Sequence, residues 1–167
     1  MSHPLVLALF STASAAAEAA GALHALGITK EHISVVAQSH ADERTLAARM
    51  DATPGVDLED SRPAAVLGEL GGRVLAAIAL VMPGIGPIVT AGPLAAELGE
   101  AAGHLAGSLA SVLKSAGLPP ERAEALQREV AAGAVLLGIH AAPADVDRVR
   151  ASLSAGGATE LETMTWP

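Results

Sequence analysis

The fold is decided by one stretch, Arg73-VLAAIALVMPGIGPIVTAGPLAA-Glu97, which has no charged residue between its two ends. Pro83-Gly-Ile-Gly-Pro87 interrupts the stretch at its middle. Two prolines around two glycines can neither continue a helix nor supply all the donors of a sheet, so the chain has to turn there. The Ala, Leu, Ile, Val and Gly residues on either side are spaced as in a helix that is packed all round. The stretch therefore predicts the tip of a buried helical hairpin.

The predicted hairpin carries small residues along both of its helices. Ser61 and Pro63 suit the first turn of the outgoing helix, which contains Gly68, Gly71 and Gly72. The returning helix has a stripe of small residues, each four positions from the next: Gly99, Gly103, Gly107, Ser111 and Ser115. Glycine inside a helix costs roughly 1 kcal/mol relative to alanine. Such a stripe, a glycine zipper, therefore indicates that another backbone packs closely against it.

We predict that this hairpin is a self-association surface. An uncovered apolar patch of this size would be unusual on a soluble monomer, so we expect a homodimer or a higher symmetric oligomer. The residues expected between copies are Gly68, Gly72, Pro83, Gly84, Gly86, Pro87, Gly99, Gly103 and Gly107.

Two β-α-β patterns flank the hairpin. The first has a short apolar strand, Leu5–Phe10, buried on both faces, then a helix from Ala15 to Leu26 with Ser11 as its N-cap and Gly27 as its stop, then a strand over Ile33–Ala37. The second has a strand over Gly133–His140, a helix that begins at Pro143 and is closed by Gly156-Gly157, and a half-exposed edge strand over Glu160–Trp166. A charged helix, Glu121–Val130, precedes it.

Two such halves on one antiparallel sheet predict an α+β, ferredoxin-like (βαβ-βαβ) fold with a large glycine-rich helical hairpin insertion. We expect one domain, in which residues 1–60 form the first half and a polar linker, residues 61–131 form the hairpin and the following helix, and residues 132–167 form the second half.

Composition excludes several classes of function. The net charge of −8 and the aromatic content of 1% leave neither a basic surface nor stacking platforms for nucleic acid. Cysteine is absent, which excludes disulfides, thiolate metal sites and cysteine nucleophiles. The N-terminal apolar run is short and lacks a basic region, so we expect a strand rather than a secretion signal, and a cytoplasmic location.

Six features follow one another over nearly the whole chain: LVLALF, an Ala-rich helix, HISVV, PGIGPIVTAGPLAA, GLPPERA and GAVLLGIH. In this arrangement the chain resembles a bacterial family, the general stress protein 17M-like or heat-induced stress protein YflT-like domains. The most specific piece of the resemblance is Pro83 to Ala96. The family implies induction under stress and a small soluble or membrane-peripheral protein. It brings no agreed catalytic residues, and this chain departs from it at Glu97, Glu100 and His104.

Those three residues are the best candidate for chemistry, because their spacing places them on one helix face. With Glu69 they could form a carboxylate–imidazole metal site of the kind found inside bundles. The same spacing also fits a solvated face with an ordinary i, i+4 pair, Glu100 and His104. His40 and His140 both follow apolar strands and could meet at strand ends, although histidines there are ordinarily loop residues with satisfied hydrogen bonds. No Gly-x-Ser-x-Gly or phosphate loop is present, so we expect no enzyme and no cofactor.

The hairpin could instead lie on a membrane surface. Each arm has about ten residues and would rise about 15 Å, half the hydrocarbon thickness, which argues against a full span. The acidic surface disfavours anionic lipid. We therefore predict a non-enzymatic, stress-associated structural or scaffold protein that binds itself. A peripheral membrane module that uses the same hairpin is the alternative, and metal or small-ligand binding through Glu97, Glu100 and His104 is the second alternative.

Overall fold

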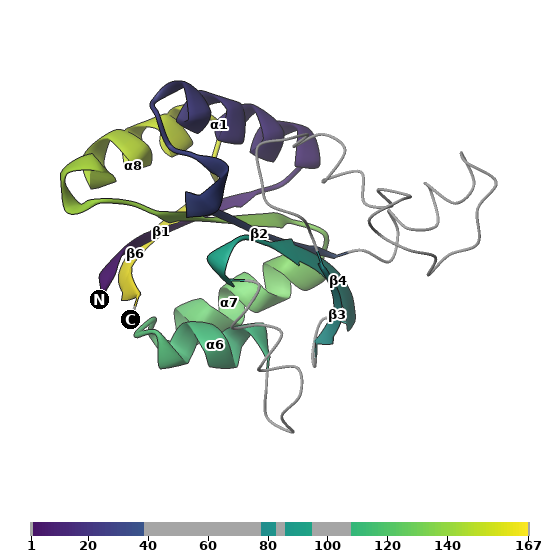
Figure 1. Cartoon of the computed structure of the whole chain (residues 1–167). Helices are drawn as coiled ribbons and strands as arrows, with labels where there is room; N and C mark the ends of the chain where they lie inside the picture. The colour runs from purple at the N-terminus through teal and green to yellow at the C-terminus, as the bar shows by residue number, and fades with distance from the viewer. Residues whose placement is uncertain (1, 39–77, 83–85, 95–107, 167) are drawn as a thin grey trace.

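The computed structural model describes residues 2–38, 78–82, 86–94 and 108–166 (Figure 1). The fold mixes helices with one antiparallel sheet. The elements in chain order are β1 His3–Phe10, α1 Ala13–Ala25, η1 Lys30–His32, β2 Ile33–Gln38, β3 Ile78–Met82, β4 Gly86–Ala91, α6 Leu109–Ser115, α7 Pro120–Ala131, β5 Val135–His140, η3 Pro143–Asp145, α8 Val146–Ala155 and β6 Glu160–Trp166.

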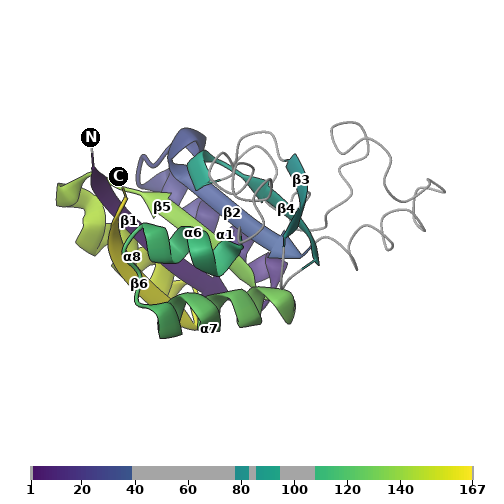
Figure 2. The same ribbon diagram turned by 90° about the horizontal axis from the view of Figure 1, so that it is seen from below.

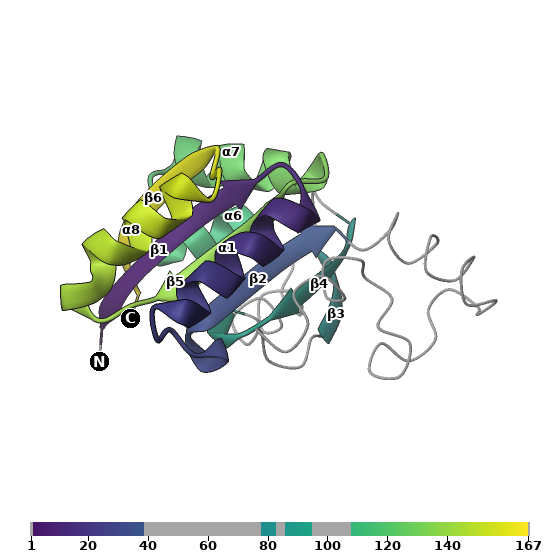
Figure 3. The ribbon, with the colours of Figure 1, turned by 90° about the horizontal axis from the view of Figure 1, so that it is seen from above.

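The sheet has six strands in the order β3-β4-β2-β5-β1-β6, and every neighbouring pair is antiparallel. Helices α1 and α8 cover one face, which Figure 3 shows from above. Helices α6 and α7 cover the other face, which Figure 2 shows from below. The described part of the molecule thus has three layers, with the sheet in the middle.

The central strands are apolar because both of their faces are covered. Every residue of β5 is buried, and so are the last six residues of β1. In β1, Val6, Ala8 and Phe10 pack with residues of α1 and α8, whereas Leu5, Leu7 and Leu9 pack with residues of α6 and α7. The prediction of a first strand buried on both faces is confirmed. So is the half-exposed edge strand β6, which is the outermost strand on its side.

The predicted helices outside the apolar stretch are also present, with one correction. The N-cap of α1 is Thr12, not Ser11: Thr12 has extended backbone and its Oγ1 accepts a hydrogen bond from the Ala15 N–H at 3.1 Å. This places the hydroxyl over an otherwise unpaired amide of the first turn, which Ser11, one residue further back, does not do. Gly27 ends the helix region with φ at 91°.

The predicted helices on either side of Pro83–Pro87 are wrong where the structure describes them. Residues 78–82 and 86–91 are strands, and β3 pairs with β4 from Ile78↔Thr90 to Met82↔Gly86. Ile88-Val-Thr90 is a run of three β-branched residues, which favours a strand over a helix. Pro87 is tolerated because β2 pairs with β4 only from Ile88 onward. The chain reverses between Met82 and Gly86, as the prolines predicted, but it joins two strands.

The predicted small-residue stripe is interrupted as well. Ser108 is extended, with φ −141° and ψ 168°, and its Oγ accepts from the Ser111 N–H at 3.1 Å. Ser108 is thus the N-cap of a new helix, α6, because a serine hydroxyl competes well for a first-turn amide. One continuous helix therefore does not run through Gly107 and Ser111.

Candidate functional site

Most of the residues that the sequence singled out lie outside the described ranges. Of the predicted self-association residues, the structure describes Gly86 and Pro87, both in β4. The others, together with the predicted metal ligands, lie outside: Gly68, Gly72, Pro83, Gly84, Gly99, Gly103, Gly107, Glu97, Glu100 and His104. Their roles stay predictions. Among the residues that the structure does describe, no cluster of three or more His, Asp or Glu side chains is arranged to hold a metal ion.

The first candidate site is the outer strand β3. It pairs with β4 on one side, and within residues 2–38, 78–82, 86–94 and 108–166 no strand pairs with its other side. Its sequence, Ile78-Ala-Leu-Val-Met82, contains no charged residue and no proline. An edge strand presents unpaired N–H and C=O groups, and charges or prolines are what usually protect such an edge. This strand has neither a charge nor a proline.

In the described part of the chain, no helix is long and apolar enough to cross a bilayer.

The second candidate site is a hydrogen-bonded chain that crosses β1, β5 and β2. His3 Nε2 lies 2.8 Å from His140 Nδ1, and His140 Nε2 lies 3.0 Å from Ser34 Oγ. The Leu94 backbone N–H donates to the same Ser34 Oγ at 2.9 Å. We call these three side chains and the Leu94 amide the relay. His140 is 4% exposed, Ser34 is fully buried, and His3 is half-buried at the rim.

The strand register brings these groups together. Leu5 pairs with His140 and Ser34 pairs with Gly138, so the relay lies at the end of the sheet where β1 and β2 begin and β5 ends. Gly138 of β5 packs closely beside it, since an added Cβ would lie 3.3 Å from Leu5 Cδ1 and 3.4 Å from Ser34 Cβ.

Gly92 brings Leu94 into reach of Ser34. Its φ is +86°, and an added Cβ would lie 2.2 Å from the Ile33 carbonyl oxygen. Only glycine allows the chain to leave β4 so close to β2. The relay therefore depends on a backbone turn as well as on its side chains.

The environment of the relay keeps His140 neutral. Burial, and then the nearby His3 and His32, lower the pKa of His140 to about 4. The Trp166 ring packs against it at 5.8 Å in a T-shaped arrangement. His32 is itself bonded through Nδ1 to Thr29 Oγ1 at 2.9 Å. His140 is thus an uncharged imidazole at neutral pH, with both nitrogens hydrogen-bonded.

Sequence reasoning paired His140 with the wrong histidine. His40, its suggested partner, lies outside the described residues, and the ring that contacts His140 is His3. Strand register joins residues 137 positions apart. No local spacing reveals such a pair. The sequence held one weak signal for the pair: His3 lies at the start of an apolar strand, and His140 lies at the end of another.

The relay has the hydrogen-bond order of a Ser–His–acid triad, with an imidazole in the third place. A nucleophilic serine must meet a substrate carbonyl, however, and Ser34 Oγ lies inside the sheet with an exposure of 0%. Its lone pairs and proton are already used by Leu94 and His140. The arrangement is therefore suited to holding and moving a proton, and not to attacking a substrate.

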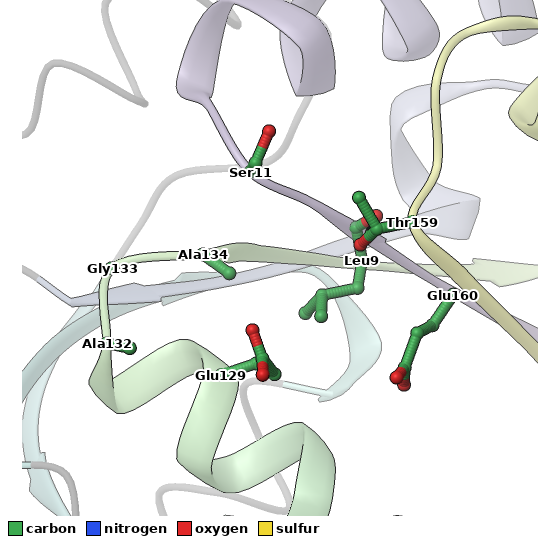
Figure 4. Close-up of a pocket in the computed structure, with 8 residues that line it drawn as sticks. All are labelled: Leu9, Ser11, Glu129, Ala132, Gly133, Ala134, Thr159 and Glu160. Atoms are coloured by element: carbon green, nitrogen blue, oxygen red, sulfur yellow. Dashed lines mark hydrogen bonds between the residues drawn. The ribbon is translucent and has the colours of Figure 1, made fainter.

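A half-open pocket of about 400 Å³ lies at the opposite end of β1, between the end of α7 and the start of β6. Figure 4 shows its lining: Leu9, Ser11, Glu129, Ala132, Gly133, Ala134, Thr159 and Glu160. Thr159 Oγ1 donates to the Leu9 carbonyl, and Glu160 pairs with Arg122. Thr159 and Glu160 already have partners, and Glu129 and Ser11 by themselves specify no ligand, so the half-open pocket carries no functional assignment.

Comparison with known proteins adds no function. No family model, no curated protein and no solved structure matches this chain. The membership of the stress-protein family that the sequence predicts therefore stays a prediction, and function has to be argued from the two candidate sites.

Proposed function

We propose that this protein is a non-enzymatic, cytoplasmic, stress-associated protein that self-associates, and that two copies join through their β3 edges. The observation that carries the proposal is the apolar outer strand, Ile78–Met82, with neither a charge nor a proline along it. The surface is the same stretch from which the sequence predicted self-association, although strands replace the predicted helices in its described part.

We also infer that β2, β5, β1 and β6, with α1 and α8 on one face, form a ferredoxin-like unit. The support is the antiparallel order β2-β5-β1-β6, combined with two β-α-β segments. On this interpretation β4 and β3 extend the unit from the β2 side, and the new edge is β3.

A second copy is the occupant that fits this edge best. Two identical antiparallel strands related by a two-fold axis satisfy each other's unpaired N–H and C=O groups and continue the sheet from one copy to the next. A five-residue strand offers about five backbone bonds, each worth roughly 1 kcal/mol net. Association costs at least about 4 kcal/mol in lost freedom. Backbone pairing thus sets the register, and burial of apolar surface around β3 has to supply most of the affinity.

The test is the mass of the full chain in detergent-free buffer, measured by sedimentation across concentrations. We expect a dimer or larger assembly that Leu80→Lys dissociates, because a charge in the middle of β3 opposes strand pairing. The matched control is Thr165→Lys, an exposed position on the opposite edge strand β6, which should keep the assembly.

Three results would overturn the proposal: a monomeric wild type, an unchanged mass of Leu80→Lys, or dissociation by Thr165→Lys as readily as by Leu80→Lys. Circular dichroism of both variants separates dissociation from unfolding. Flotation with neutral and acidic liposomes covers the membrane alternative. If monomeric protein floats, the strand carries a lipid contact and not a protein contact.

A further inference from the structure

We propose that the relay is a proton-driven latch, in which a proton added at the rim residue His3 reverses the hydrogen bonds inward to Ser34 and loosens the attachment of Leu94. The inference rests on the geometry of β1, β5, β2 and the end of β4. It stands whether or not the chain self-associates.

The distances in the relay fit either tautomer of each imidazole, and we assign the neutral relay the direction that gives the Ser34 hydroxyl proton an acceptor. Ser34 Oγ accepts from the Leu94 N–H, so its own proton is free to go to His140 Nε2. His140 then carries its proton on Nδ1 and donates it to His3 Nε2. Every group is satisfied in this arrangement. In the part of the chain that the structure describes, no buried side-chain nitrogen or oxygen lacks a partner.

A proton added at His3 Nε2 reverses this direction. His3 Nε2 becomes a donor, so His140 Nδ1 has to accept, and the His140 proton moves to Nε2. His140 Nε2 then donates to Ser34 Oγ, which already accepts from the Leu94 N–H. Ser34 now receives two donors, and its own hydroxyl proton loses its acceptor. One proton at the rim thus creates one unpaired polar hydrogen in the interior.

The proton enters at His3 and not at His140. His3 is half-buried at the rim, whereas His140 is 4% exposed. The titratable groups that act on His140 are His3 on β1 and His32 on η1. Both lower the pKa of His140, so both oppose a charge on it. The remaining neighbours, Trp166 on β6 and the Leu94 amide, carry no charge.

The expected consequence is a looser end of β4. Leu94 is held on β2 by Ser34 Oγ, and Gly92 passes directly over the Ile33 carbonyl. An unsatisfied buried group shifts an equilibrium by roughly 5- to 150-fold. We therefore expect local opening at Leu94 to become more frequent by that factor when His3 is protonated.

The test follows the full-length wild type by NMR between pH 8 and pH 5. Imidazole ¹⁵N spectra should show His140 protonated on Nδ1 while the relay is neutral and on Nε2 when His3 carries the added proton. The Leu94 amide protection factor, corrected for the intrinsic pH dependence of exchange, should fall roughly 5- to 150-fold over the same range. The amide of Leu136, in the middle of β5, should not follow.

Two variants isolate the relay. His3→Phe should remove the pH dependence at Leu94, and Ser34→Ala should make Leu94 exchange fast at every pH. His24→Phe, at an exposed histidine of α1, should leave the wild-type behaviour intact. The proposal is overturned if His140 keeps its Nδ1 proton when His3 carries the added proton, or if Leu94 protection is the same at both ends of the range. Both measurements are made on the wild type and do not require any variant to fold.

Discussion

The two edges of the sheet are built in opposite ways. On β6, Glu160 and Glu162 share Arg122 of α7, and the NH2 group of Arg122 lies 3.5 Å from Glu160 Oε2. Glu160 and Glu162 occupy every second position at the start of this strand, and the buried Met164 and Trp166 continue the same series to its end. On β3, none of the five residues is charged. Exposed ion pairs contribute little stability, so the acidic residues of β6 matter more as a barrier to strand addition. On the proposed self-association, we therefore expect the partner at β3 and not at β6.

The largest effect is expected where the β3 side of the sheet is attached. Gly92→Ala should destabilise the fold by about 2–5 kcal/mol. A left-handed backbone costs an L-residue about 1–2 kcal/mol, and the clash with the Ile33 carbonyl adds an overpacking term of about 1–3 kcal/mol. Gly157, with φ +92° and open space around it, is the matched control. Gly157→Ala should cost only about 1–2 kcal/mol. Urea unfolding measures both, and equal losses would contradict the close approach.

The second-largest effect concerns the pH dependence of stability that His140 causes, at the end of the sheet where β6 lies against the relay. The pKa of His140 is lowered from 6.5 to about 4 in the folded protein. Between these two pH values the unfolded chain binds the proton and the folded chain does not. The free energy of unfolding should therefore fall as the pH drops from 6.5 to 4. Below pH 4, protonation of His140 should cause no further loss. The loss is at most about 3 kcal/mol. Urea midpoints for wild type and His140→Leu test it, since the variant should lack this component.

The smallest effect on stability should come from opening the protected edge. Glu160→Thr combined with Glu162→Thr should change the free energy of unfolding by less than about 1 kcal/mol for each pair with Arg122. The same double variant should raise the sedimentation mass, because β6 then lacks its charges, as β3 does. Arg148→Ala on α8, which removes the 2.9 Å pair with Asp145 of η3, is the control and should leave the mass unchanged. An unaltered mass in the double variant would show that charge does not protect this edge.

Local pattern in the sequence predicted the central part of the sheet well. Burial on two faces selects apolar runs, as at 5–10 and 135–140. A positive φ selects glycine, as at Gly27, and a half-exposed edge selects a mixture of polar and apolar residues, as in β6. The helices α7 and α8 were found from their charged faces and initial prolines.

Residues 78–82 and 86–91 of the apolar stretch were misassigned because small aliphatic residues fit a buried helix and a buried strand equally well. Ile88-Val-Thr90 was the signal that favoured a strand, and the glycine spacing outweighed it. The relay could not be predicted at all. His3, Ser34 and His140 meet only through the register of three strands, and register between distant segments leaves no trace in local spacing.

The packing of Trp166 against His140 has a practical use. The chain contains one tryptophan, and its indole ring lies edge-on to the innermost imidazole of the relay. Emission from this protein therefore comes from a single fluorophore that packs against His140 and pairs across the sheet with His3. Ordinary fluorimetry should respond to protonation in and around the relay in real time, without a dye, a label or an added reporter.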